Sequence, residues 1–475
     1  MRKRPNLVYV FADQWRRQAT GFMKEDPVKT PRIDQFAEES LVFHHAVSCT
    51  PLCSPHRASL MTGKYALSHG VFTNCKLGAD IMLSPEEVCI GDVLHQSGYA
   101  TGYIGKWHLD LPEQNVTPTP ASGAKNWDAY TPPGPKRHGF QYWYSYGTFD
   151  NHLAPHYWED TPEMIQVNQW SVEHETDKAI EFLERQRGKD APFTLFLSWN
   201  PPHTPFELVP DRYKNMYSNA KLSFRPNVKP IDPLQVVTGE TMAGGKERLE
   251  QYTRDYFAAV SGLDEQFGRL LDHLDKLGMA EDTIVVLTSD HGELLGSHGY
   301  MAKHSWHEES IGVPFIVRWP KRIPAGKTNL VLNTVDIMPT LLRLMDLPVP
   351  NSVEGTSRHE QFLNPPQTVP EVDHAAYISA FPGRKELLEM FAEAGKDNLT
   401  YGWRGVRSSR YTYVVDRGYF PENNNVTRLL YDLQEDPYQL HPLQLESAAE
   451  HPAAAKLEVQ LKNFLLRTND PFELE

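Results

Sequence analysis

Short runs of apolar and β-branched residues recur along the chain, separated by stretches with helical patterns. Continuous apolar runs of this length are typical of strands that other layers cover on both faces. Alternation of such strands with helices favours a parallel sheet. We therefore predict an α/β fold in which helices sandwich a large, mostly parallel or mixed central sheet. The runs lie at residues 7–11, 100–104, 193–197, 283–287 and 314–317.

Polar clusters directly follow three of these runs. They are Asp13 and Gln14, Lys106 and His108, and Asp290 and His291. In open α/β sheets, ligands bind in a crevice at the carboxyl ends of the strands. We therefore expect the three clusters to converge on one crevice.

The C-terminal part has a different pattern. The proline-rich stretch 347–370 marks a boundary between a large domain, residues 1–370, and a smaller subdomain, residues 371–475. Within the smaller part, residues 403–415 are predicted to form an antiparallel strand pair or one long strand, and residues 453–466 a closing helix. We therefore predict an α+β subdomain with an antiparallel sheet.

Charge and composition limit the partners of the protein. A net charge of -14 disfavours binding to nucleic acid or to an anionic membrane. No apolar run approaches the ~20 residues that span a bilayer. The apolar run at 7–12, which follows a basic start, is too short for a signal peptide. We expect a cytoplasmic protein as the sequence stands, or a periplasmic or secreted one if a signal peptide has been removed.

The chain has four cysteines, and one of them has unusual neighbours. Cys53 stands in a C-x-P-x-R frame with Pro55 and Arg57, whereas Cys49, Cys75 and Cys89 do not and are predicted to be structural. Taken alone, Cys53 could also be an ordinary buried thiol. Four further motifs accompany it in a fixed order: Asp13-Gln14, Gly105-Lys106-Trp107-His108-Leu109, Pro201-Pro202-His203-Thr204-Pro205, and Ser289-Asp290-His291-Gly292-Glu293 with Lys303 downstream.

Together these motifs resemble the type I sulfatases of the alkaline phosphatase superfamily. The resemblance covers about residues 5–345, and residues 431–437 look like the C-terminal tag of that family. In this family a maturing enzyme oxidises the motif cysteine to formylglycine. The resemblance therefore implies an alkaline phosphatase-like fold, a sulfatase-maturing partner enzyme, and sulfuric ester hydrolysis through a hydrated formylglycine made from Cys53.

The chemistry explains why an aldehyde is useful here. A serine that attacked a sulfate ester would become a new, stable sulfate ester. A hydrated aldehyde has two hydroxyl groups on one carbon, so that one can attack sulfur and deprotonation of the other can then expel sulfate. The nucleophile is thereby regenerated without a second hydrolysis.

The resemblance also implies a metal site and a set of catalytic residues. The metal would be bound by Asp13, Gln14, Asp290, His291 and the modified Cys53. Gln14 stands where many sulfatases have a second aspartate, so that the site carries one negative charge fewer. Oxygen ligands favour Ca²⁺, with Mg²⁺ or Mn²⁺ as alternatives.

The implied catalytic residues divide by charge. Arg57, Lys106 and Lys303 would supply fixed positive charge around the sulfate. His108 would act as the base during sulfate release, and His203 would protonate the leaving alcohol. Each could instead have a structural or surface role if it were considered alone.

Two features concern the substrate. The aromatic segment 140–158, with Trp143 and His152, could bind a sulfated saccharide or could pad the core. Arg404, near Arg407, could recognise a second sulfate or a carboxylate, or could face solvent.

Two other functions stay open. A phosphonate monoester or phosphodiester hydrolase can share the Asp13-Gln14 start, although Lys106-Trp107-His108 looks like the sulfatase version of its segment. A catalytically silent protein that binds sulfated glycans becomes plausible if Cys53 stays unmodified.

Overall fold

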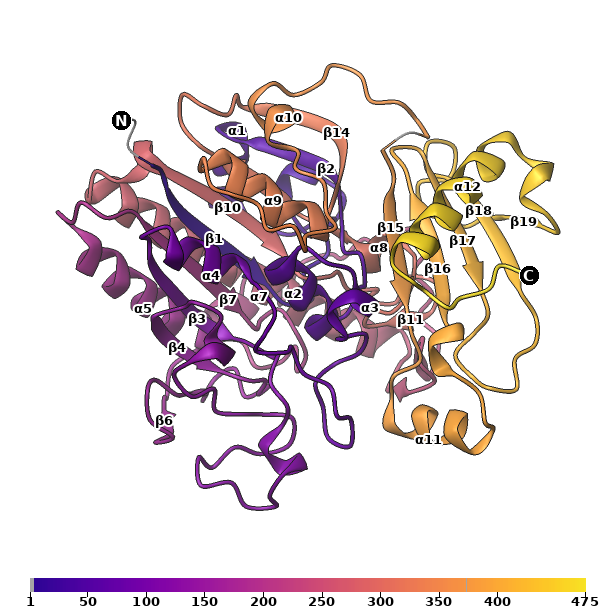
Figure 1. Cartoon of the computed structure of the whole chain (residues 1–475), viewed down its shortest axis with the longest axis horizontal. Helices are drawn as coiled ribbons and strands as arrows, with labels where there is room; N and C mark the ends of the chain where they lie inside the picture. Colours follow the sequence, from indigo (N-terminus) through magenta and orange to yellow (C-terminus); the bar gives the residue numbers. More distant parts are fainter. Residues whose placement is uncertain (1–3, 373) are drawn as a thin grey trace.

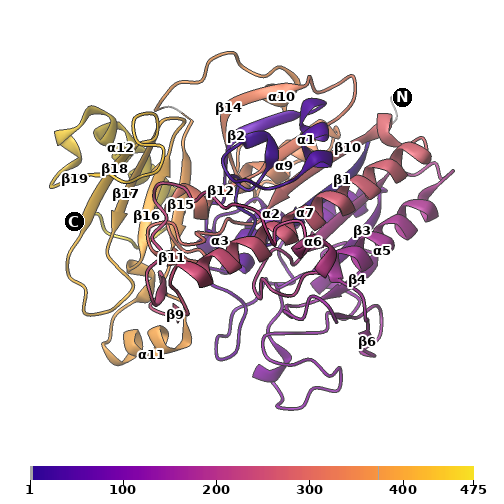
Figure 2. The same ribbon diagram turned by 180° about the vertical axis from the view of Figure 1, so that it is seen from behind.

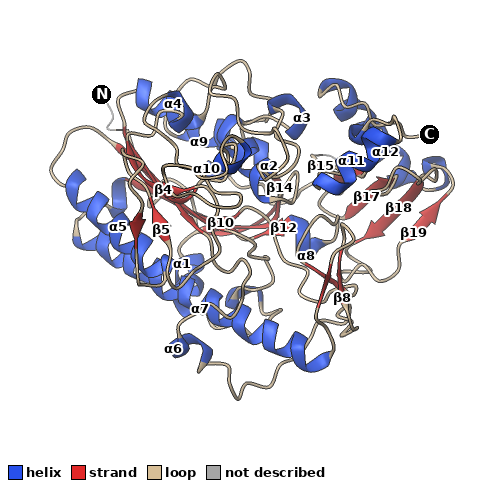
Figure 3. Ribbon diagram, turned by 90° about the horizontal axis from the view of Figure 1, so that it is seen from below, coloured by secondary structure: helices blue, strands red, loops and turns tan. Residues whose placement is uncertain are grey.

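A nine-stranded mixed sheet forms the centre of the molecule (Figures 1 and 3). It is seen in a computed structural model that describes residues 4–372 and 374–475, so the first residues of the basic start lie outside the described part. The strands run in the order β12-β2-β13-β10-β1-β7-β3-β4, with β14 beside β2. They are β1 Asn6–Ala12, β2 Leu41–Val47, β3 Ala100–Lys106, β4 Tyr142–Tyr146, β7 Phe193–Trp199, β10 Thr283–Ser289, β12 Gly312–Val313, β13 Phe315–Arg318 and β14 Gly326–Asn333.

The parallel part of the sheet positions the site. Strands β10, β1, β7, β3 and β4 are parallel neighbours, whereas β13 is antiparallel to both β10 and β2. The predicted large, mixed α/β sheet is therefore confirmed, and each of the five predicted runs forms a strand. Strands β2, β4, β12 and β14 were not predicted.

Helices cover both faces of this sheet (Figures 2 and 3). Along β1, Val8 and Val10 pack in one core with α5 and α7, while Leu7 and Tyr9 pack in another with α4 and α9. Burial on both faces explains why the strand sequence is apolar throughout rather than alternating. The main helices are α1 Pro31–Glu38, α2 Cys53–Thr62, α4 Ile90–Gln96, α5 Ser171–Gln186, α7 Lys246–Lys276, α9 Thr334–Leu344 and α10 His359–Leu363.

The C-terminal part forms a second, five-stranded antiparallel sheet at one side of the molecule (Figure 1). The helix α12 Pro452–Arg467 packs against its strands β16 and β17. This confirms the predicted antiparallel sheet and closing helix, while the boundary near residue 370 stays a prediction. The strands are β15 Ala376–Ala380, β16 Trp403–Arg407, β17 Tyr411–Asp416, β18 Thr427–Asp432 and β19 Leu443–Leu445, with α11 Lys385–Glu393 beside them.

Shorter elements complete the fold. Two small sheets are formed by β5 with β6 and by β11, β8 and β9. Over residues 4–372 and 374–475, no helix is both long and apolar enough to cross a membrane. The short elements are α3 Ala66–His69, α6 Asp211–Lys214, α8 Glu308–Ile311, β5 His156–Tyr157, β6 Ile165–Gln166, β8 Leu234–Val236, β9 Thr241–Met242 and β11 Tyr300–Met301.

Candidate active site

Four polar side chains meet at the carboxyl ends of four adjacent parallel strands. Asp290 follows β10, Asp13 follows β1, Asn200 follows β7, and Lys106 ends β3. The order of the strands in the sheet thus brings the three predicted polar clusters together. Asn200 was not among the predicted residues, although its place shortly after the predicted run 193–197 was the available signal.

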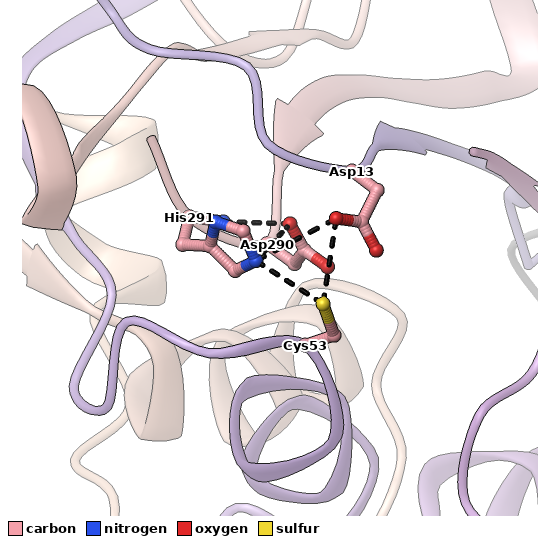
Figure 4. A group of neighbouring side chains, drawn as sticks. All are labelled: Asp13, Cys53, Asp290 and His291. Atoms are coloured by element: carbon pink, nitrogen blue, oxygen red, sulfur yellow. Dashed lines mark hydrogen bonds and ion pairs between the residues drawn. The ribbon is translucent and has the colours of Figure 1, made fainter. Parts of the chain in front are cut away.

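Cys53 approaches this edge of the sheet from a helix. It is the first residue of α2, and its buried Sγ lies 3.5 Å from Asp13 Oδ1 and 3.3 Å from His291 Nε2 (Figure 4). Because α2 presents its N-terminus here, the helix dipole favours an anion at this position. Cys53 therefore lies where a nucleophile could meet a sulfate.

The cluster of Asp13, Cys53, Asp290 and His291 fits a divalent cation. Its donor atoms all lie within 4.8 Å of one another, and the four residues are buried. His291 Nδ1 donates to the carbonyl of Gly292 at 3.0 Å, so the Nε2 lone pair faces Asp13 Oδ1 and Asp290 Oδ1, each at 3.5 Å. Acceptors that face one another in a buried site are stabilised when a cation binds between them, so this cluster could hold a metal ion.

The two carboxyl groups of the cluster differ in their surroundings. Burial opposes ionisation of Asp13, but Lys106, His203 and Arg57 outweigh it and hold its pKa well below the usual range. Burial and then the Asp13 carboxylate raise the pKa of Asp290, whose Oδ2 accepts no hydrogen bond among the described residues. A bound dication would offset this repulsion, and the oxygen-rich ligands suit Ca²⁺, Mg²⁺ or Mn²⁺.

Gln14 lies beside the cluster and has polar partners of its own. Its amide oxygen accepts a hydrogen bond from Lys303 Nζ, and its amide nitrogen donates to Glu293. Its backbone N–H donates to Asp290 Oδ1 at 3.1 Å. Gln14 thus links Lys303 to the predicted metal ligands, while its own role as a ligand stays a prediction.

Arg57 and Lys106 supply buried positive charge. Arg57 Nη2 lies 3.0 Å from Asp13 Oδ2 and 3.2 Å from Asp290 Oδ2. Lys106 Nζ lies 2.8 Å from Asp13 Oδ2 and donates to Asn200 Oδ1 at 3.1 Å. Burial alone would lower the pKa of both cations, but the carboxylates outweigh it and raise both values. Both side chains are therefore charged, and Arg57 holds the two carboxylates in place.

The two predicted proton-transfer histidines have opposite electrostatics. His108 Nε2 donates to the carbonyl of Cys75 at 3.1 Å, which leaves Nδ1 as an acceptor without a partner among the described residues. Burial and then Lys106 hold the pKa of His108 well below its usual value. His108 is therefore neutral, as a base must be.

His203 is protonated instead. Burial and then Lys303 lower its pKa, but the carboxylates of Asp150 and Asp13 outweigh them and raise it to about 9. His203 Nδ1 lies 2.7 Å from the Thr204 carbonyl, to which it donates, and 3.4 Å from Asp150 Oδ1. The proton that His203 can transfer is therefore on Nε2.

A cleft of about 500 Å³ joins these residues. Its walls include Cys53, Lys106, His108 and His203, and an adjoining cavity includes Gln14 and Lys303. Several further lining residues were not among the predicted site residues, including Asn74, Trp127 and Asp150. The signal for Trp127 was an aromatic residue within a proline-rich loop, and Asp150 lay in the aromatic segment noted above.

Neither Trp143 nor Arg404 reaches the cleft, which corrects both predicted substrate contacts. Trp143 is 3% exposed and stacks on Tyr103 in the core, because β4 is an edge strand of the central sheet, paired with β3, rather than a surface insertion. Arg404 is fully buried, and its guanidinium donates to both carboxylate oxygens of Asp470.

His152 also lies outside the cleft lining, directly behind it. Its side chain is 2% exposed, and Nε2 donates to the carbonyl oxygen of His203 at 2.9 Å. His152 therefore supports the backbone of His203 rather than a sugar.

Comparison with known proteins assigns the family. Residues 5–347 match the family model for Sulfatase, and residues 296–469 match that for N-sulphoglucosamine sulphohydrolase, C-terminal. An endo-4-O-sulfatase from Bacteroides thetaiotaomicron is 36% identical over 99% of this chain and 94% of its own. An ulvan-active sulfatase from Formosa agariphila is 34% identical over 99% and 83%.

A solved structure agrees with the sequence relatives. A Bacteroides thetaiotaomicron protein, described in connection with the metabolism of multiple glycosaminoglycans, superposes with a TM-score of 0.85 at 34% identity, covering 98% of this chain and 97% of its own. The cleft, the ordered motifs and these matches lead to one conclusion: the chain belongs to the sulfatase family of the alkaline phosphatase superfamily.

Proposed function

We propose that the protein removes sulfate from a sulfated carbohydrate. The observation that carries this proposal is the meeting of Cys53, a buried dication site, a neutral His108 and a cationic His203 at one cleft. The relatives named as an endo-4-O-sulfatase and an ulvan-active sulfatase support a carbohydrate ester. We further propose that Cys53 is converted to formylglycine by a maturing enzyme and that the metal is Ca²⁺.

The chain's own residues can then perform each remaining task. The hydrated formylglycine would supply a nucleophile that regenerates itself, and the cation would polarise it and the sulfate. Asp13, Asp290 and His291 would hold the cation, and Arg57 orders the two carboxylates. Lys106 places a fixed positive charge at the cleft wall, where charge develops during transfer.

Proton transfer follows from the two histidines. His108, with Nδ1 unprotonated, can accept the proton that must leave for sulfate to be expelled. His203, with its mobile proton on Nε2, can protonate the oxygen of the leaving alcohol. A sugar alkoxide is strongly basic, so this protonation matters most for carbohydrate esters.

Trp127 gives the cleft a surface suited to a sugar ring. Its side chain is 40% exposed and lies nearly parallel to the ring of His108, with centroids 6.4 Å apart. Asn74, Asn126 and Asn151 line the same cavity and can bond hydroxyl groups. An aromatic face with amides around it is typical of a saccharide site.

Side-by-side rates separate this proposal from the phosphonate alternative. We expect protein matured with the formylglycine-generating enzyme to hydrolyse para-nitrophenyl sulfate faster than the matching phenylphosphonate ester. A panel of sulfated saccharides, assayed for released sulfate, should then include a substrate that is better than the aryl ester. Faster phosphonate turnover with no sulfate release from any saccharide would contradict the proposal.

The pH dependence tests the role of His203. Because its protonated form is the acid, activity should be present below a pKa of about 9 and lost as the pH rises through that value. In Asp150→Asn the larger of the two anionic contributions that raise this pKa is gone, so the alkaline limb of kcat/KM should move down by about one pH unit or more. The exposed Asp211→Asn is the matched control and should leave the limb in place.

A further inference from the structure

Two further cations lie beyond the catalytic residues in the same cleft, with the carboxylate of Glu240 beside them. The cavity that adjoins the one above Cys53 is lined by Lys76 and Arg384, the latter from the loop that leads into α11. The two cavities share four lining residues, Asn74, Trp127, Asp150 and His203. One ligand can therefore place a sulfate above Cys53 and a second group beside Lys76 and Arg384.

Lys76 is a mostly buried cation, and no carboxylate of the described residues lies within ion-pair distance of it. The residue is 8% exposed, and no hydrogen bond or ion pair reaches its Nζ from the described residues. Its backbone carbonyl accepts hydrogen bonds from Asn115 Nδ2 and from the N–H of Ala79, both at 3.2 Å, so the residue is held in place. A buried ammonium group is costly unless an anion pairs with it.

Arg384 pairs with two exposed carboxylates, which solvent screens, and its Nη1 donates to the carbonyl of Thr238 at 3.2 Å. Its Nε lies 3.4 Å from a carboxylate oxygen of Glu240 and 3.5 Å from one of Glu386, and both carboxylates are more than half exposed. Burial and then the charge of Arg384 lower the pKa of Lys76 to about 8, although both glutamates act in the opposite direction. The two cations thus repel each other, and an anion between them would relieve that repulsion.

The backbone ties Lys76 to the nucleophile. Asn74, two residues before Lys76, accepts a hydrogen bond through Oδ1 from the N–H of Ser54 at 3.0 Å. The carbonyl of Cys75 accepts the hydrogen bond of His108. Lys76 therefore follows directly on residues that contact the start of α2 and the predicted base, so its position relative to Cys53 is fixed.

We propose that Lys76 and Arg384 form a second anion subsite, which takes a carboxylate or a second sulfate carried elsewhere on the same saccharide. This rests on the proposed function and narrows it to saccharides with at least two anionic groups. Arg384 can bind either group through its planar fork, and Lys76 adds a point charge.

Three matched disaccharides test the subsite. All carry the sulfate to be removed; the first adds a uronic acid carboxylate, the second has that carboxyl reduced to an alcohol, and the third replaces it with a second sulfate. We expect wild-type kcat/KM to be higher for one of the dianionic substrates than for the reduced one. In Lys76→Met and in Arg384→Gln this preference should fall about tenfold, mainly through KM, as one lost charge-assisted hydrogen bond predicts. The substrate that wild type prefers shows whether the group is a carboxylate or a sulfate.

Controls separate the subsite from folding and from the proposed function. Lys76→Arg should retain most of the preference, and Lys385→Met, an exposed lysine on the same segment, should retain all of it. Thermal unfolding of each variant shows whether it is folded. If wild type releases sulfate but has no preference for a second anion, or if Lys76→Met keeps that preference, the subsite is wrong and the proposed function stands. If wild type releases no sulfate from any of the three or from para-nitrophenyl sulfate, the proposed function itself fails.

Discussion

Replacing Cys53 should abolish turnover while leaving the fold intact. In Cys53→Ala the nucleophile is absent, and in Cys53→Ser attack on sulfur would leave a stable sulfate ester. We expect kcat for sulfate release to fall at least about 10⁴-fold in both, as for loss of other covalent nucleophiles. The side chain is buried at the start of α2, so the effect cannot come from loss of an exposed contact.

The controls for this experiment use the other thiols and the mass of the peptide. Cys49→Ala removes a thiol that is equally buried but lies outside the C-x-P-x-R frame, and it should keep most of the activity. The intact mass of the peptide across residue 53 should differ between protein expressed with and without the maturing enzyme. Full activity in material whose Cys53 is unmodified would contradict the formylglycine mechanism, and so would a fully active Cys53→Ser.

The same variant separates catalysis from mere binding. Suppose that wild type releases sulfate from a saccharide, and that Cys53→Ala binds the same saccharide but releases none. Binding then does not need Cys53 and catalysis does, which agrees with the enzymatic function. If wild type, fully matured, also binds without turnover, the alternative of a silent glycan-binding protein is correct.

The sequence predicted the sheet well where strands are buried on both faces. β1 and β10 are continuous apolar runs because helices cover them on both sides. β2 was missed because His44 and His45 interrupt its apolar pattern, and both are only partly buried. β4 was missed because a run of aromatic residues resembles a sugar-binding surface as much as a strand. Trp143, Tyr144 and Tyr146 are core residues, and Tyr142 packs partly buried against the core.

The site could be predicted to the extent that it follows from strand ends and motifs. Asp13, Lys106 and Asp290 lie at strand ends, and a parallel sheet brings such ends together whatever the loops do. Arg404 could not be placed, because its partner Asp470 lies 66 positions further on and no local pattern links the two. Trp127 and Lys76 belong to loops, whose paths depend on tertiary contacts that one sequence does not display.

Replacing the predicted metal ligand Asp290 should have opposite effects on the unfolding temperature without and with a divalent cation. Burial and the Asp13 carboxylate disfavour an ionised Asp290, so without a divalent cation Asp290→Asn should unfold at the same temperature as wild type or higher. With Ca²⁺ at about a hundredfold excess over Kd, wild type should gain about 3 kcal/mol, and the variant much less. Sulfate release by the variant should fall at least about a thousandfold, because the cation is needed to activate the nucleophile at residue 53.

The measurement is thermal unfolding with a chelator and then with Ca²⁺, Mg²⁺ or Mn²⁺ in turn, so that the ion giving the largest rise in wild type identifies the preferred metal. Asp336→Asn is the matched control, because Asp336 is a buried carboxyl that pairs with Arg358 at 3.4 Å and belongs to neither cavity of the cleft. Because burial also raises the pKa of Asp336, its replacement need not lower the unfolding temperature in chelator, but the variant should keep the full rise caused by the cation. If the cation raised the unfolding temperature of Asp290→Asn as much as that of wild type, the cation would bind elsewhere. Full sulfatase activity in chelator would mean that the buried cluster has no catalytic metal.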